Sequence, residues 1–140
     1  MRERFMRIRF CLMCILVFLS ACGEGFEEIP SHIFYGTLES TSVDASGHRV
    51  YLRLVGPDDL IDSDAYYITD CRLLGPTCDF QINFVVEAEY KVFGFIDLND
   101  DASLIDPHPS SGDLVSPGRP LLIFGRTRMD FPDSAWHPMP

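Results

Sequence analysis

The chain has 140 residues, a length that suits one domain rather than two. Its 46% apolar content excludes a disordered chain. With 21 acidic and 11 basic residues the net charge is −10, which argues against nucleic acid as a partner because phosphate backbones would be repelled.

Residues 1–21 have the pattern of a secretory signal peptide. A basic segment, MRERFMRIRF, leads into an unbroken apolar run, FCLMCILVFL at 10–19. Ten apolar residues are too few to span a bilayer, which needs about 20, but they suit the helical core of a signal peptide. The alternative is an N-terminal core helix, which would show polar positions at helical spacing, and this run has none.

The end of this segment, LSAC at 19–22, resembles the lipobox of bacterial lipoproteins. The resemblance implies cleavage before Cys22 and acylation of that cysteine, which anchors the chain to the membrane through lipid (palmitate and related acyl chains). Gly23 stands where an aspartate would imply retention in the inner membrane, so the outer membrane of the cell envelope is favoured. Residues 22–31 then form an acidic, flexible tether without apolar periodicity.

The remainder, 32–140, shows apolar runs separated by turn residues and no convincing helical period. In 48–56 the alternation is clean, and in 78–86 Phe80, Ile82, Phe84 and Val86 lie in phase on one face. This pattern predicts an all-β fold, a small antiparallel β-sandwich. The predicted strands are 32–40, 48–56, 65–71, 78–86, 89–96 and 120–129.

Two segments are predicted to be irregular. Residues 97–119 form an unusually long loop for so small a domain, and such loops are often functional. The C-terminal FPDSAWHPMP contains three prolines, and Trp136 within it is expected to cover an open edge of the core. The alternative for Trp136 is an exposed contact residue.

Five cysteines are present, and Cys11 and Cys14 lie in the predicted signal peptide. With Cys22 assigned to the lipid, Cys71 and Cys78 are the remaining pair. An exported domain with one such pair is expected to form a disulfide, here across the turn at 75–76. The alternative is two free buried thiols.

The acidic stretch DLNDDASLID, 97–106, predicts a cation site, because calcium takes six to eight oxygen ligands that loops supply at alternate positions. The loop is not an EF-hand, because Ala102 and His108 replace its glycine and glutamate. The alternative is a solvated acidic turn. The candidate ligands are Asp97, Asn99, Asp101, Asp106 and Asp113.

The segment EAEYKVFGFIDLNDD resembles part of the transthyretin-like and carboxypeptidase-regulatory-like β-sandwiches of secreted proteins and lipoproteins. There, a strand with the pattern G-x-Y-x-V-x-A-F-x-D enters an acidic D-x-N-x-D loop that often ends in GD. Ala88 and Glu89 depart from that pattern, and Asp106 falls one place late. The resemblance implies a prealbumin-like (transthyretin/Ig-like) sandwich and a cation site, but no enzymatic activity. The matching residues are Tyr90, Val92, Phe95, Asp97, Asn99, Asp101, Gly112 and Asp113.

No nucleophile–base arrangement, phosphate loop or paired histidine motif is recognisable, so the protein is not expected to be an enzyme. The sequence predicts an envelope lipoprotein whose domain is a binding or structural module, with the membrane and a protein of the envelope as partners. The alternative is an assembly or tethering subunit of a larger envelope or secretion complex, such as the transthyretin-like lipoprotein of type VI secretion.

Overall fold

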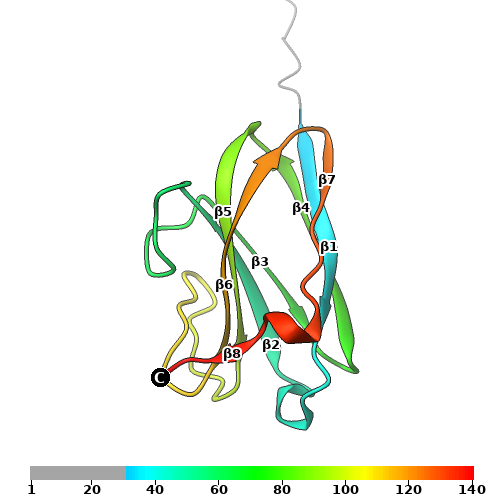
Figure 1. Ribbon diagram of the computed structural model, residues 1–140, viewed down its shortest axis with the longest axis vertical. Helices are drawn as coiled ribbons and strands as arrows, with labels where there is room; N and C mark the ends of the chain where they lie inside the picture. Colours follow the sequence, from blue (N-terminus) through cyan, green and yellow to red (C-terminus); the bar gives the residue numbers. More distant parts are fainter. Residues whose placement is uncertain (1–30) are drawn as a thin grey trace, which may run out of the picture.

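The computed structural model describes residues 31–140, so the predicted signal peptide, Cys22 and the tether lie outside the described residues (Figure 1). Regular structure in this range consists of strands and two short 3-10 helices, η1 (Val43–Ala45) and η2 (Asp133–Ala135). The strands are β1 (His32–Glu39), β2 (Arg49–Val55), β3 (Tyr67–Arg72), β4 (Thr77–Val85), β5 (Ala88–Asp97), β6 (Leu114–Ile123), β7 (Arg126–Arg128) and β8 (His137–Pro138).

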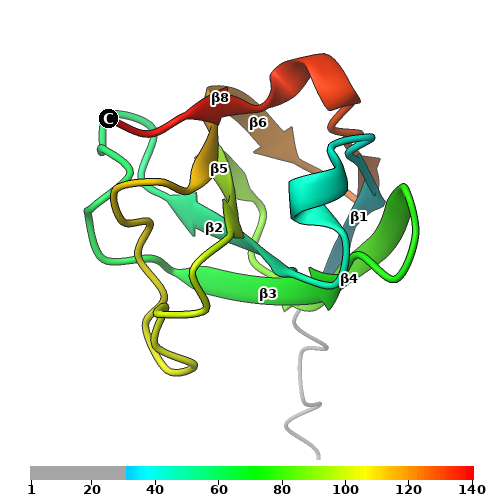
Figure 2. The same cartoon turned by 90° about the horizontal axis from the view of Figure 1, so that it is seen from below.

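The strands form two sheets that face each other, which confirms the predicted all-β sandwich (Figures 1 and 2). The smaller sheet has the order β4-β1-β7 and the larger sheet has the order β3-β2-β5-β6-β8. Every pairing is antiparallel except that between β1 and β7, which is parallel.

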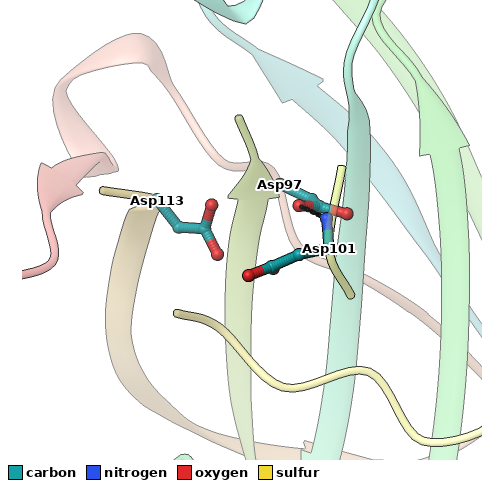
Figure 3. Close-up of side chains that lie close together, drawn as sticks. All are labelled: Asp97, Asp101 and Asp113. Atoms are coloured by element: carbon teal, nitrogen blue, oxygen red, sulfur yellow. Dashed lines mark hydrogen bonds between the residues drawn. The ribbon is translucent and has the colours of Figure 1, made fainter. Parts of the chain in front are cut away.

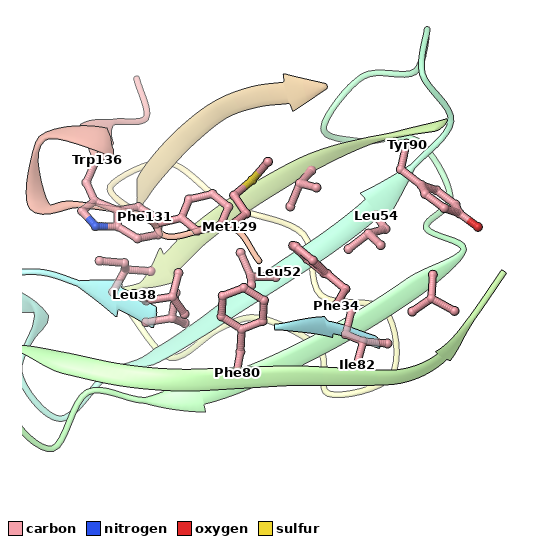
Figure 4. Packing of buried hydrophobic residues seen from close by; sticks show 14 of the residues in the cluster. Phe34, Leu38, Leu52, Leu54, Phe80, Ile82, Tyr90, Met129, Phe131 and Trp136 are labelled. Atoms are coloured by element: carbon pink, nitrogen blue, oxygen red, sulfur yellow. The ribbon is translucent and has the colours of Figure 1, made fainter. Parts of the chain in front are cut away.

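The main core lies between the sheets, where alternate residues of β1, β2 and β5 meet (Figure 4). Trp136 covers one edge of this core, as predicted. Its ring stacks on that of Phe131 with centroids 6.0 Å apart, and its indole N–H donates to the Glu39 carbonyl oxygen at 2.7 Å. The hydrogen bond satisfies the polar atom of an otherwise apolar side chain, so this largely buried position costs little.

The outer face of the larger sheet is buried as well. All residues from Val50 to Val55 are buried, although they alternate between the two faces of β2. Loops 56–66 and 98–113 lie over this outer face (Figure 2). Beneath them Tyr51 stacks on Phe95 of β5, with ring centroids 5.1 Å apart. The central strands are therefore buried on both sides.

The predicted strand at 120–129 is wrong in its limits. β6 begins at Leu114, and the chain turns at Gly125, whose φ of 62° suits glycine, before β7. β6 contains two prolines, Pro117 in the segment predicted to be irregular and Pro120 at the start of the predicted strand. They are tolerated because β8 pairs only with residues 114–115, so the rest of β6 is an edge where no ladder bond is lost.

The predicted phase of 78–86 fails at its end. The pairing of β1 with β4 shifts register between Phe34 and His32, and Phe84 takes a positive φ of 59°. As a result Val85 is buried, while Phe84 and Val86 point to solvent. This irregularity is a β-bulge, which changes the direction of every side chain that follows it.

The predicted disulfide between Cys71 and Cys78 is confirmed, with the two Cα atoms 6.0 Å apart. Cys71 belongs to β3 of the larger sheet and Cys78 to β4 of the smaller one. The bond therefore joins the two layers at the point where the chain crosses between them.

Candidate functional site

The candidate site lies where β5 ends, at the end of the sandwich opposite the start of β1 (Figure 1). Asp97 is the last residue of β5 and is 3% exposed. Its two carboxylate oxygens accept hydrogen bonds from the backbone N–H groups of Asp101 at 3.1 Å and Ala102 at 3.2 Å. Because the preceding strand is rigid and buried, these bonds fix the first turn of the loop against it.

Asp113 closes the same loop from its other end. Its side chain is fully buried and accepts backbone N–H bonds from Leu98 at 3.0 Å and Ser110 at 2.8 Å. Its own carbonyl oxygen accepts the N–H of Met139 at 2.7 Å, next to β8. One carboxylate thus joins the two ends of the loop, and the adjoining backbone joins the loop to the C-terminal segment.

Asp101 completes a cluster of three carboxylates. Oxygens of Asp97, Asp101 and Asp113 lie within 4.8 Å of one another (Figure 3). The Ser110 hydroxyl donates to Asp101 at 3.1 Å and accepts from the Asn99 amide at 2.8 Å. Asn99 therefore acts at the rim of the cluster, through Ser110, a residue that the D-x-N-x-D pattern does not include.

The cluster concentrates negative charge in a partly buried place. Within residues 31–140, none of the ion pairs to Lys, Arg or His involves these three carboxylates. Burial raises the pKa of the Asp113 carboxyl above its ordinary value, and the charges of Asp97 and Asp101 add to that increase. Buried charge without a counter-charge is costly, so a cation or a proton at this place would stabilise the fold.

Asp106, the other predicted ligand, lies elsewhere. Its carboxylate contacts Arg53 at 3.3 Å and His108 at 3.0 Å. The hydrogen bond with His108 lowers the pKa of Asp106, and the Arg53 charge lowers it further. Of the five candidate ligands, the structure therefore brings three carboxylates together and places Asn99 at the edge of the cluster. Asp106 instead pairs with the Arg53 guanidinium.

Arg53 is a feature that the sequence did not reveal. Its guanidinium is fully buried on the outer face of β2 and donates to the carbonyl oxygens of Ile61 and Ser63, as well as to Asp106. Loops 56–66 and 98–113 are thus held by one side chain. Alternation in 48–56 places Arg53 on a face, but only the loops above it decide that this face is buried.

Compared with known proteins, the chain matches no family model, no curated protein and no solved structure. Among the described residues, no helix has the length and apolarity that crossing a membrane requires. The fold class is a small β-sandwich, and any function has to be argued from the residues above.

Proposed function

We propose that the protein is a lipid-anchored lipoprotein of the cell envelope, whose β-sandwich is a non-enzymatic binding or structural module with a calcium-binding loop. The observation that carries the calcium proposal is the group of three carboxylates within 4.8 Å, two of them buried and none in an ion pair with a described cationic side chain.

The hydrogen bonds of the cluster leave room for a metal. Each carboxylate oxygen can accept two bonds, and the four oxygens of Asp97 and Asp113 each accept one from the backbone. Three carboxylates carry six oxygens, and water can complete the six to eight that calcium prefers. The loop is already folded around the carboxylates, so binding requires little ordering.

The proposed anchor fits the chemistry of the domain. The basic segment, apolar run and LSAC sequence support export and acylation at Cys22. A disulfide between Cys71 and Cys78 persists in an oxidising compartment and is rare in the cytosol. β1 begins at one end of the sandwich and the carboxylates lie at the other, so an anchored domain would present its calcium loop away from the membrane.

Thermal unfolding of the purified protein in Ca²⁺ and in chelator tests the calcium proposal. Calcium at 100 times its dissociation constant adds about 2.7 kcal/mol, which raises Tm by about 10 °C for a domain of this size. Asp101→Asn should remove most of this shift, because it takes one charge from the cluster and keeps an oxygen for Ser110. Asp100→Asn is the matched control, because Asp100 is an exposed neighbour that pairs with His48. An equal Ca²⁺ response in both variants, or none in the parent, would overturn the proposal.

A further inference from the structure

Half of the ten exposed large apolar side chains in residues 31–140 lie at the end of the sandwich where β1 begins, opposite the acidic cluster. Five residues there are between 55% and 78% exposed. They come from the start of β3, the bulge and turn between β4 and β5, and the end of β6 (Figure 1). We call this set the apolar rim, and it consists of Tyr66, Phe84, Val86, Leu122 and Phe124.

The contacts at this end place part of the rim beside the first residue of β1. His32 pairs with Val85 across the sheet, its ring lies 5.9 Å from that of Phe124, and its Nδ1 accepts the N–H of Gly125 at 2.7 Å. On the other side the Tyr90 hydroxyl donates to the Val86 carbonyl oxygen at 2.9 Å. The β4–β5 turn and the β6–β7 turn therefore both lie close to the point where β1 starts.

The exposure of Phe84 results from a specific backbone conformation. A positive φ is uncommon for residues other than glycine, and a bulky side chain there is a true outlier. The conformation turns a phenyl ring out of the β4 alternation and into solvent, where it loses the core contacts that the sequence phase would give it. Backbone strain of this kind clusters at binding sites and switch regions.

We infer that the apolar rim rests on the surface of the lipid bilayer to which the chain is anchored; this inference depends on the lipid anchor proposed above. Only nine residues separate Cys22 from His32. A chain of that length spans at most about 35 Å when fully extended, which limits the distance between the start of β1 and the acylated cysteine. The eight residues of β1 place the opposite end roughly 25 Å farther away.

The charge at the rim identifies the kind of lipid surface. Glu87 lies 3.7 Å from His32, Glu89 pairs with Leu122, and the exposed Arg126 pairs with Ile33, so negative charge predominates among these three residues. These carboxylates do not attract anionic headgroups, so the contact is made by Phe, Leu, Tyr and Val side chains at the boundary of headgroup and acyl chains. A neutral phosphatidylcholine surface is therefore sufficient. The contact orients the domain, while the lipid on Cys22 provides the affinity.

Fluorescent labelling of the full-length lipoprotein in phosphatidylcholine vesicles tests the inference. A nitrobenzoxadiazole label is attached through Phe84→Cys or Leu122→Cys at the rim. Val43→Cys and Leu74→Cys are matched controls, because these side chains are 88% and 85% exposed at the opposite end. A quencher carried on the lipid acyl chains should reduce emission several-fold more at 84 and 122 than at 43 and 74.

Equal quenching at all four positions would overturn the rim contact and leave the anchor intact. Rim labels that are shielded from an aqueous quencher but unaffected by the lipid quencher would also overturn it, because a protein then covers the rim. Mass spectrometry and flotation separate these results from failure of the anchor. The Cys22→Ser variant, which cannot be acylated, should not float with vesicles and is the negative control. If the parent chain is also not acylated and does not float, both proposals are removed.

Discussion

Replacing Arg53 with methionine should lower the free energy of unfolding by about 2–4 kcal/mol. The guanidinium is fully buried and donates to two carbonyl oxygens of loop 56–66 and to Asp106 of loop 98–113. Bonds of this charged type contribute about 1.5–3 kcal/mol each, and a buried carbonyl left without its donor costs about 1–3 kcal/mol. Methionine keeps the apolar stem and avoids burying a charge, so the expected loss is below the sum of the bonds.

Unfolding in urea, followed by the fluorescence of Trp136, measures this loss. Trp136 is the single tryptophan of the chain and is largely buried, so its emission reports on the core. Arg49→Met is the control, since Arg49 lies on the same face of β2 but pairs with Asp70 near the surface. Such an exposed pair contributes about 0–1 kcal/mol.

A loss no larger in Arg53→Met than in Arg49→Met would show that the two loops do not depend on the buried guanidinium. Burial of apolar side chains beneath the loops would then be their main source of stability. Amide hydrogen exchange gives a second test. Amides of 56–66 and 98–113 should exchange faster in Arg53→Met than in the parent protein, and at the parent rate in Arg49→Met. An unchanged m value would confirm that the denatured state is the same in both variants.

Three further outcomes are expected. Cys71→Ser with Cys78→Ser should cost about 2–3 kcal/mol in urea unfolding, since the disulfide closes a loop of about eight residues in the denatured chain. Hydrogen bonds from Thr41 lower the pKa of Asp133 in the folded state. The stabilisation from this carboxylate is therefore present above the pKa of the unfolded state and is lost as pH falls through the lower pKa of the folded state. Asp133→Asn should reduce the loss of stability that thermal melts show below about pH 4. Gly36→Ala should cost about 1–3 kcal/mol, because its Cβ would lie 1.9 Å from a main-chain carbonyl oxygen, and a melt with unchanged Tm would contradict this packing.

Strands with local signals could be predicted from the sequence to within two residues. β1 to β5 alternate or run apolar between clear turn residues, and these rules depend on neighbours in the chain. The first part of β6, residues 114–119, was predicted to belong to the irregular loop, and prolines such as Pro117 oppose a strand by the same local rules. Their tolerance depends on how short β8 is, which is a property of the assembled sheet.

The candidate site was partly predictable for the same reason. Asp97 and Asp101 follow a predicted strand at ligand spacing, and Asp113 was included through the GD of the resemblance; hydrogen bonding across the loop brings the three together. Asp106 has the same local signal, but a partner 53 residues away, Arg53, captures it. A local sequence pattern cannot predict a contact between residues so far apart in the chain. The role of Ser110, which lies outside the D-x-N-x-D pattern, could not be predicted for the same reason.

The burial of the central strands on both faces has a consequence for how this sequence can change over evolutionary time. In β4, outward positions such as Gln81 and Asn83 are exposed, so replacements should be accepted at every second residue. In β5, every position from Val92 to Asp97 is buried, and neither face offers such freedom. Sequences that diverge from this one while keeping its fold should therefore change first at the outward positions of β4 and conserve its inward positions. In β5 they should keep a continuous apolar block that ends in aspartate.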